Sequence, residues 1–355
     1  MSLAKGATLG ILGNGQLGRM LAGAAARLGL RTICFGPGDD SPAAQVCTGH
    51  FTADYNDTDA LIDFARACDV VTVEFESIPV GAAEIVIAAG TPFRPGPNAL
   101  AIAQDRVEEK RFLESAGIAC DPWCAIESLE DLVAAHAALG PDAILKTRRD
   151  GYDGKGQVRL AADCDLATAW QAIGERPAIL EGFVDFSLEI SAVIARGSDG
   201  AVAAYAPSRN IHEGGILRRA VVPAPVSESV VETAQALAAR LAERLDYVGV
   251  LALEYFVMPD GSLLANEFAP RVHNSGHWTP EACLTGQFEN HVRAVAGWPL
   301  GEPCLLHGAE MENLIGEDAG VPVEELLMRG QLTLYGKGEI RPGRKMGHLV
   351  QLKPL

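Results

Sequence analysis

The chain of 355 residues lacks an excess of positive charge, a long apolar run and any paired cysteine motif. Its 29 Lys and Arg stand against 46 Asp and Glu, a net charge of −17, so no basic surface attracts a phosphate backbone. Charged residues or glycines interrupt the longest apolar runs well short of the roughly 20 residues that span a bilayer. We therefore expect neither a nucleic-acid partner nor a membrane.

The eight cysteines are scattered, and none has the Cys-x-x-Cys spacing typical of a metal site. The closest pair is Cys120 and Cys124. Because no signal-peptide pattern opens the chain, we expect reduced thiols in a cytoplasmic protein. Hydrophobic residues at 48% and charged residues at 21% are typical of a globular protein, and the length predicts two or three domains.

A hairpin late in the chain carries the most informative pair of residues. Two apolar runs, residues 251–257 and 263–268, flank the Asp-Gly pair at 260–261, which predicts a two-residue turn. In that register Glu254 and Glu267 lie directly opposite each other, with Cβ atoms about 5 Å apart. Mg²⁺ would neutralise two carboxylates placed so closely. Two solvated carboxylates, or one shared proton, are the alternatives.

The first third of the chain has the pattern of a nucleotide-binding fold. The apolar stretch 8–12 predicts a buried strand, which runs into Gly13–Gly18 (GNGQLG) and then a helix from Arg19. Strands predicted at 31–35 and 70–74 alternate with helices, which favours a parallel, doubly wound sheet. Glycines at such a turn let the backbone approach a phosphate, although they also serve tight helix–sheet packing.

The same region raises the question of a dinucleotide. Asp39 and Asp40 lie about 20 residues past the glycine motif, where an NAD site has its ribose-binding acid. However, Gly36–Gly38 (GPG) separates them from the end of the strand. The motif therefore indicates a phosphate ligand rather than NAD in particular. Glu76 and Ser77 follow the third strand at the ligand-binding edge of such a sheet, either as substrate contacts or as a solvated strand end.

A second phosphate-binding element follows a charge-rich helix, which is predicted over 98–117 and would bridge to the next domain. A short strand ends in Lys146, and the loop Gly151–Gln157 (GYDGKGQ) comes soon after, with Lys155 among its three glycines. Such a loop can cover phosphates with N–H groups and an ammonium group. It is not a Walker loop, because the G-K-[ST] triplet is missing; a plain glycine-rich hairpin is the alternative. Glu189, alone in an apolar strand, either faces solvent or serves a ligand.

The order of these elements resembles that of the ATP-grasp ligases, and three further motifs narrow the resemblance. The ordered set is Lys146, the loop 151–157, Glu181, Glu189, Glu254 and Glu267. The further motifs are Gly13–Met20 (GNGQLGRM), Ala269–Thr279 (APRVHNSGHWT) and Arg344–His348 (RKMGH). Together they resemble the ATP-dependent 5-(carboxyamino)imidazole ribonucleotide synthetases of purine biosynthesis, over nearly the whole chain.

The resemblance implies a fold and a reaction. The fold is α/β, with an N-terminal Rossmann-like domain (1–98), an ATP-grasp domain (99–295) with a mobile lid near 125–190, and a small C-terminal domain (296–355). ATP phosphorylates bicarbonate to carboxyphosphate, which carboxylates the exocyclic amine of 5-aminoimidazole ribonucleotide, leaving ADP and phosphate. The resemblance therefore implies ATP and Mg²⁺ as cofactors, aminoimidazole ribonucleotide and bicarbonate as substrates, and a homodimer.

The resemblance also implies roles for individual residues. The metal would be held by Glu254 and Glu267. ATP would contact Arg106, Lys146, Gly151, Tyr152, Asp153, Gly154, Lys155, Gly156, Gln157, Glu181, Gly182, Phe183, Val184, Glu189, His212, Asn266 and Glu267. The ribonucleotide would contact Gly15, Gln16, Leu17, Glu76, Ser77, Arg271, His273, Asn274, Ser275, Arg344 and Lys345. The catalytic residues would be Asp153, Lys155, Arg271 and Lys345.

Three details qualify these assignments. The turn at 13–18 would bind the 5′-phosphate of the ribonucleotide or lie against it. Asp153 would orient the substrate amine. Ala269 stands where many ATP-grasp enzymes place a metal-binding Asn, so the third metal contact would be water or Asn266.

Three other functions remain as alternatives. A sister ATP-grasp ligase would use another acceptor, such as glycinamide ribonucleotide or biotin, and the HNSGHW motif at 273–278 disfavours it. An NAD-dependent oxidoreductase leaves the Gly/Lys loop and the glutamate pair unexplained. A non-catalytic nucleotide-binding subunit is disfavoured because both metal-binding acids and both lysines are present.

Overall fold

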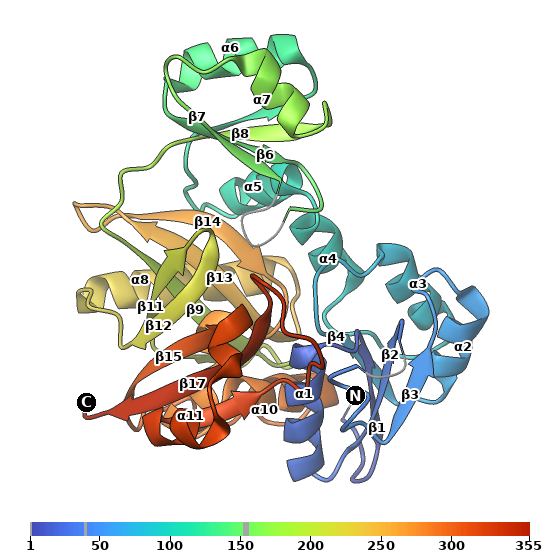
Figure 1. Ribbon diagram of the computed structural model, residues 1–355. Helices are drawn as coiled ribbons and strands as arrows, with labels where there is room; N and C mark the ends of the chain where they lie inside the picture. The colour runs from blue at the N-terminus through green and yellow to red at the C-terminus, as the bar shows by residue number, and fades with distance from the viewer. Residues whose placement is uncertain (1, 39–40, 152–155) are drawn as a thin grey trace.

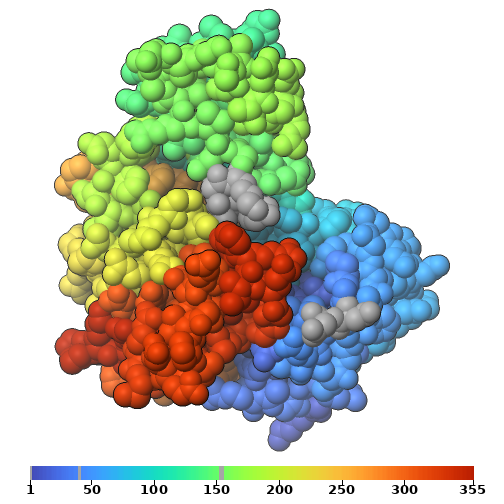
Figure 2. Space-filling view, in the orientation of Figure 1, coloured from blue at the N-terminus to red at the C-terminus, as the bar shows by residue number. Residues whose placement is uncertain are grey.

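The computed structural model describes residues 2–38, 41–151 and 156–355 (Figure 1). Within those residues the strands form three sheets: a parallel N-terminal sheet, a small antiparallel sheet here called the lid sheet, and a large antiparallel sheet. Figure 1 shows the lid sheet and its helices above the large sheet, with the N-terminal sheet to one side. In the space-filling view of Figure 2 the lid is a separate lobe over the other two parts.

The N-terminal sheet is parallel, as the alternation of strands and helices predicted. Its strand order is β3-β2-β1-β4. The strands are β1 (Thr8–Leu12), β2 (Arg31–Gly36), β3 (Gly49–Thr52) and β4 (Val70–Val73), and the helices are α1 (Gln16–Arg27), α2 (Thr58–Arg66) and α3 (Val80–Ala88). Strands β1 and β4 are buried along their whole length, as expected for a parallel sheet covered on both faces.

The single helix predicted over 98–117 is wrong, because the segment forms two helices. They are α4 (Pro97–Ala103) and α5 (Arg106–Ser115). Asp105 caps the second helix, and its carboxylate accepts hydrogen bonds from the N–H groups of Val107 and Glu108, both at 3.2 Å. An Asp side chain that binds the backbone ahead of it favours a helix start over a helix interior.

The lid sheet places two predicted ATP contacts on one face. Its order is β5-β8-β6-β7, and helices α6 and α7 pack against it. The elements are β5 (Trp123–Ile126), α6 (Leu129–Leu139), β6 (Ala143–Thr147), β7 (Gln157–Leu160), α7 (Leu166–Ala172) and β8 (Ala178–Gly182). Leu145 and Leu180 belong to the core under these helices. Since side chains alternate along a strand, their neighbours Lys146 and Glu181 lie on the opposite face.

The large sheet runs β14-β13-β9-β11-β12-β15-β17-β16, and β10 pairs with the end of β9 on the side that β11 also occupies. Its strands are β9 (Leu188–Arg196), β10 (Val202–Ala204), β11 (Ser208–Glu213), β12 (Ile216–Val222), β13 (Gly249–Val257), β14 (Leu263–Ala269), β15 (Gly308–Ile315), β16 (Gln331–Leu334) and β17 (Lys345–Lys353). Its helices are α8 (Glu228–Arg244), α9 (Thr279–Ala282), α10 (Gln287–Ala296) and α11 (Val323–Arg329), with 3-10 turns at Asn274–Gly276 and Gly316–Gly320.

Helices cover the large sheet on both sides. Helix α8 shares a core with Ile190 and Leu251, and α10 shares a second core with Val193 and Val250 on the other face. Because β12 pairs with β15, the C-terminal strands continue the sheet of the central region. The domain boundaries given above remain a prediction.

The two-residue turn predicted at 260–261 is wrong. The loop has three residues, since the N–H of Met258 donates to the carbonyl of Ser262 at 2.9 Å. Gly261 takes the last loop position with φ of +85°, a left-handed conformation that favours glycine. The Asp-Gly pair correctly marks the hairpin, but Pro259 also belongs to its loop.

The longer turn changes the register next to the two glutamates. Tyr255 pairs with Ala265, whereas Leu253 pairs with Phe268, so a β-bulge lies between them. At the bulge Glu254 faces the two-residue stretch 266–267. Beyond the bulge the register is the predicted one, with Leu253 opposite Phe268, because the bulge takes up the residue that the longer loop adds. Glu254 therefore faces Glu267 as predicted, but it shares that position with Asn266.

Two further observations concern expectations from composition. All eight cysteines are free thiols, as predicted. None of the helices among the described residues combines the length and the apolar character needed to cross a bilayer.

A buried carboxyl in α9 predicts a pH dependence of stability. Oxygen Oε2 of Glu281 is buried without a hydrogen-bond partner, and burial raises the pKa of Glu281 from 4.5 to about 7. The unfolded chain releases this proton near pH 4.5 but the folded chain keeps it until about pH 7, so the free energy of unfolding falls across that interval. We expect Glu281→Gln to stabilise the protein more at pH 8 than at pH 5.5, by about 1–2 kcal/mol in urea unfolding.

The exposed Glu232 in α8 provides the control for this measurement. Glu232→Gln should change stability by the same small amount at both pH values. An equal gain from Glu281→Gln at pH 5.5 and pH 8 would contradict the raised pKa.

Candidate active site

An ion pair on the lid sheet forms one wall of the site. Lys146 on β6 contacts the carboxylate of Glu181 on β8, and the Lys110 ammonium lies 3.4 Å from the same carboxylate. Burial alone would raise the pKa of Glu181, but Lys146 and Lys110 outweigh it and lower the pKa to about 2. Glu181 is therefore an ionised hydrogen-bond acceptor at neutral pH, suited to an amino group such as that of adenine.

Two neighbouring carboxylates at the β-bulge, the buried Glu254 and the half-exposed Glu267, form the facing wall. Burial, and then the charge of Glu267, raise the pKa of Glu254 to about 7. Among the described residues, its Oε1 has two distant partners, the hydroxyl of Ser191 at 3.4 Å and Nε2 of His273 at 3.5 Å. Glu267, in contrast, pairs with Arg106 through Nη1 and Oε2 at 2.9 Å. An arginine balances the charge of Glu267, whereas Glu254 has no comparable cationic partner in the part of the chain that the structure describes.

This imbalance fits a divalent cation. Glu254, Glu267 and Asn266 lie together at the bulge and offer carboxylate and amide oxygens, the hard ligands that Mg²⁺ prefers. Among the described residues no cluster of three or more His, Cys, Asp or Glu could hold a metal by itself. A Mg²⁺ here would complete its shell with phosphate oxygens and water, as it does in many nucleotide sites.

Two further predicted ATP contacts lie on the adjoining strands. Nδ1 of His212 on β11 lies 2.7 Å from Oε2 of Glu189 on β9. Burial would lower the pKa of His212, but the hydrogen bond to Glu189 and the nearby carboxylates raise it overall. Glu189 and Ser191 share one face of β9, and Ser191 pairs with Glu254 across the strands. Glu189 therefore lies on the same face of the sheet as Glu254. Its side chain is half-buried.

An ion pair between two residues predicted to bind the ribonucleotide joins the N-terminal sheet to the large sheet. Arg271 follows β14, and its guanidinium contacts both carboxylate oxygens of Glu76, with Nη2 to Oε1 at 3.0 Å. Burial raises the pKa of Glu76, but Arg271 outweighs this and keeps it below its usual value. The two residues lie 195 positions apart in the sequence, so the pair links the ligand-binding edge of the N-terminal sheet to the large sheet.

Two buried amides hold the segment that follows Arg271. Gln287 accepts the His273 N–H at 2.9 Å and donates to the His273 carbonyl at 2.7 Å. Asn313 on β15 exchanges two hydrogen bonds with Asn274, at 3.0 and 2.5 Å. Burial, and then the charge of Arg271, hold the pKa of His273 well below its usual value, so this imidazole is neutral.

The glycine turn is occupied by a side chain of the protein itself. The N–H of Gly18 donates to Oε2 of Glu74 at 2.6 Å, and the N–H of Gly15 donates to Oε1. Gly13 has φ of +112°, and a Cβ there would overlap the Glu74 side chain. Glu74 therefore takes two N–H donors of the turn. That the turn binds the 5′-phosphate of the ribonucleotide, or lies against it, stays a prediction.

Four more residues predicted to contact the ribonucleotide differ from one another in burial and in their contacts. Leu17 is buried in the core, and Ser77 is exposed in the turn after β4. Arg344 donates to the carbonyl of Glu339 at 2.9 Å. Lys345 lies close enough for its charge to lower the pKa of His273.

Other predicted contacts border the loop or lie outside the described residues. Phe183 lies under the guanidinium of Arg159, 4.3 Å from the ring centre to Cζ, and Arg106 donates to the Gly151 carbonyl at 3.3 Å. Outside the described residues lie Asp39, Asp40, Tyr152, Asp153, Gly154 and Lys155.

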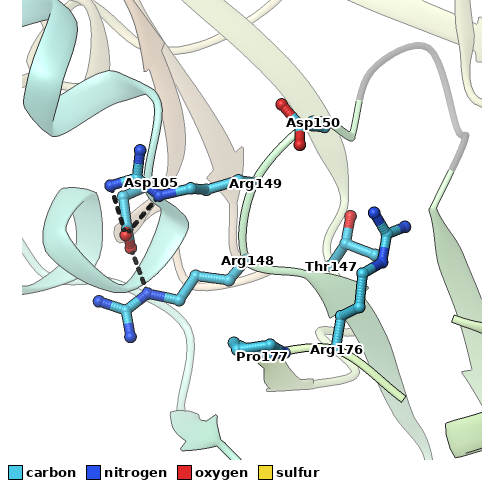
Figure 3. Close-up of a pocket in the computed structure, with 7 residues that line it drawn as sticks. All are labelled: Asp105, Thr147, Arg148, Arg149, Asp150, Arg176 and Pro177. Atoms are coloured by element: carbon cyan, nitrogen blue, oxygen red, sulfur yellow. Dashed lines mark hydrogen bonds and ion pairs between the residues drawn. The ribbon is translucent and has the colours of Figure 1, made fainter. Parts of the chain in front are cut away.

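Figure 3 shows a cavity of about 270 Å³ at the base of the lid. Its lining residues are Asp105, Thr147, Arg148, Arg149, Asp150, Arg176 and Pro177. Arg148 Nε and Arg149 Nη2 lie 2.7 and 3.0 Å from the two carboxylate oxygens of Asp105. Since Asp105 also caps α5, these ion pairs connect the end of β6 to the start of that helix.

Sequence reasoning missed four residues around the site: Glu109, Lys110, Gln287 and Asn313. All four are buried polar residues that hold another part of the site in place. Glu109 and Lys110 belong to a charge-rich helix, and such a pattern is typical of a helix exposed to solvent. A buried polar residue is recognisable only when its distant partner is known.

The chain matches three domain families in succession. They are the ribonucleotide synthetase preATP-grasp domain over residues 6–104, the ATP-grasp domain over 111–288, and the phosphoribosylaminoimidazole carboxylase C-terminal domain over 309–354. It is 52% identical to the N5-carboxyaminoimidazole ribonucleotide synthase of Brucella melitensis, over 99% of this chain and 98% of that one.

Solved structures agree with these matches. The ADP complex of an N5-carboxyaminoimidazole ribonucleotide synthetase superimposes with a TM-score of 0.96 at 38% identity, covering 99% of this chain and 94% of the other. The Aspergillus clavatus enzyme in complex with ADP and 5-aminoimidazole ribonucleotide gives a TM-score of 0.92 at 30% identity, with the same coverage. The chain belongs to the family of N5-carboxyaminoimidazole ribonucleotide synthases, within the ATP-grasp ligases.

Proposed function

We propose that this protein carboxylates the exocyclic amine of 5-aminoimidazole ribonucleotide, using ATP and bicarbonate and releasing ADP and phosphate. The observation that carries the proposal is the pair of neighbouring carboxylates, Glu254 and Glu267. They lie between the Lys146–Glu181 ion pair of the lid and the Arg271 segment. A nucleotide bound between the lid and the hairpin would then lie beside a site for a second substrate.

The charges of the site suit the proposed intermediates. Lys146 and Arg106 can balance the negative charge of the phosphoryl group that is transferred. Arg271 is a planar donor suited to carboxylate or phosphate oxygens. Bound Mg²⁺ would supply positive charge that neutralises the charge developing during phosphoryl transfer. In the protein, Glu254 and Glu267 would hold this ion, Lys146 would hold the phosphates, and Glu181 would accept a hydrogen bond from the base.

Mg²⁺, bicarbonate, a homodimer and a cytoplasmic location are further parts of the proposal. The oxygen-rich bulge supports Mg²⁺, and family membership supports bicarbonate. The homodimer and the location rest on the resemblance to the family. Sedimentation of the purified protein, with twice the mass of one chain as the expected result, tests the dimer.

ADP release tests the function directly. We expect ADP release from MgATP and bicarbonate to be slow alone and to rise at least roughly tenfold when 5-aminoimidazole ribonucleotide is added, because the acceptor completes the site. Omitting bicarbonate, or chelating the metal with EDTA, should remove the stimulation. Unstimulated hydrolysis would point to a sister ligase with another acceptor, and tight NADH binding without hydrolysis would revive the oxidoreductase.

A further inference from the structure

The outer edge of β14 is held by two adjacent residues of α5. Glu109 accepts the N–H of Phe268 at 2.6 Å, and Nζ of Lys110 donates to the carbonyl of Asn266 at 2.9 Å. Both side chains are almost fully buried, with residue exposures of 3% and 1%. A buried charged residue at such a place needs partners, and here the partners are backbone groups of β14.

These two backbone groups flank Glu267. The Asn266 carbonyl belongs to the peptide unit before it, and the Phe268 N–H belongs to the peptide unit after it. Strand β14 is the edge of the large sheet, and its ladder to β13 is interrupted at this bulge. Among the described residues, the segment 119–120 pairs with this edge at Ala265, next to these peptide units. The peptide units on either side of Glu267 are held by the side chains of α5.

Helix α5 holds the Glu267 side chain as well. Arg106, which ion-pairs with that carboxylate at 2.9 Å, lies three and four positions before Glu109 and Lys110. Residues at this spacing share one helix face. The face therefore contacts Glu267 at its carboxylate and at both adjoining peptide units.

Lys110 also connects this strand to the lid. Its ammonium contacts the buried carboxylate of Asp121 and lies 3.4 Å from that of Glu181 on β8. The same ammonium therefore binds the backbone beside the metal-site glutamate and the carboxylate proposed to accept a hydrogen bond from the base. A shift of α5 would displace both.

We infer that Glu109 and Lys110 are positioning residues, which fix the bulge of β14 so that Glu267 points at the metal bound with the nucleotide. The inference rests on the proposed function for the identity of that ligand. Neither residue touches substrate. Their hydrogen bonds act through the backbone of β14, and the family motifs quoted above contain neither.

A pair of variants of similar size tests the role of Glu109. Glu109→Gln keeps an oxygen that can accept the Phe268 N–H, whereas Glu109→Met has nearly the same length and no acceptor. We expect Glu109→Met to weaken MgADP binding by roughly 10- to 100-fold, the usual loss when a group behind a metal ligand is removed, and Glu109→Gln to stay within about threefold of the parent. Titration calorimetry with MgADP measures this without any turnover.

Further measurements separate positioning from general damage. In steady-state assays Glu109→Met should raise the KM for MgATP and leave the KM for aminoimidazole ribonucleotide within twofold. Arg111→Ala, on the exposed side of the same helix, is the control and should match the parent. MgADP affinity within twofold of the parent in Glu109→Met, or an equal loss in Glu109→Gln, would overturn the inference. A parent that binds MgADP but shows no stimulation by aminoimidazole ribonucleotide would instead contradict the proposed function.

Discussion

Glu267→Gln is expected to lower the stimulated rate of ADP release by at least roughly 100-fold while the protein remains folded. The amide keeps the size of the side chain and can still accept a hydrogen bond from Arg106. It loses the negative charge that a hard cation requires, and metal-dependent phosphoryl transfer depends on the position and charge of that cation. Titration of ADP release against Mg²⁺ should show a strongly raised requirement for the metal in this variant.

The fold should tolerate this change. Loss of the charge relieves the repulsion with Glu254, which offsets the weakened contact to Arg106. Urea unfolding of Glu267→Gln should therefore agree with that of the parent within about 1 kcal/mol. The exposed Glu232→Gln in α8 is the matched control for activity. Turnover within threefold of the parent at low Mg²⁺ would contradict the assignment of Glu267 as a metal ligand.

The sequence predicted the pair of carboxylates but not the strand geometry that brings them together. Apolar runs around an Asp-Gly pair were sufficient to place Glu254 and Glu267 on one hairpin. Loop length and bulge could not be predicted, because both depend on contacts outside the hairpin. The bulge is held by α5, which lies some 160 residues earlier in the chain.

Other differences between the predicted and the observed structure also arise from contacts between distant segments. The glycine motif correctly predicted a strand–turn–helix, yet its N–H groups bind Glu74, a residue 56 positions after Gly18. Asp105 gave a local signal for a helix start inside the predicted helix 98–117, and its ion pairs with the lid reinforce that break. Local patterns thus predicted elements and motif residues, whereas the buried polar groups that connect distant segments required the structure.

Arg271→Ala is expected to produce the largest loss on the substrate side. It removes both contacts to Glu76 and leaves that carboxylate half-buried beside the substrate edge without its partner. Breaking a buried ion pair in this way costs about 3–5 kcal/mol, which corresponds to a loss of roughly 100-fold or more if the linkage is needed in the transition state. The stimulation of ADP release by aminoimidazole ribonucleotide should therefore nearly disappear.

The Arg271→Ala substitution should affect the use of aminoimidazole ribonucleotide and not the binding of the nucleotide. MgADP affinity, measured by calorimetry, should change by less than about threefold, because Lys146 and the two glutamates proposed to hold the metal stay in place. Arg271→Lys keeps the charge but cannot contact two oxygens in a plane, so it should fall between Arg271→Ala and the parent. Arg219→Ala breaks a partly exposed pair with Glu310 on neighbouring strands of the same sheet and should have little effect on activity.

Variants of Glu76, the ion-pair partner of Arg271, distinguish two roles of Arg271: an interdomain link and a direct substrate contact. If Arg271 acts only by holding Glu76, then Glu76→Gln, Arg271→Ala and the double variant should all lose a similar amount of stimulated activity. If Arg271 also binds the anionic substrate, Arg271→Ala should lose more than Glu76→Gln, and the KM for bicarbonate or ribonucleotide should rise only in the arginine variants. Because carboxyphosphate and the ribonucleotide are both anions beside a planar guanidinium, we expect the second result. Normal stimulation in Arg271→Ala would contradict both roles.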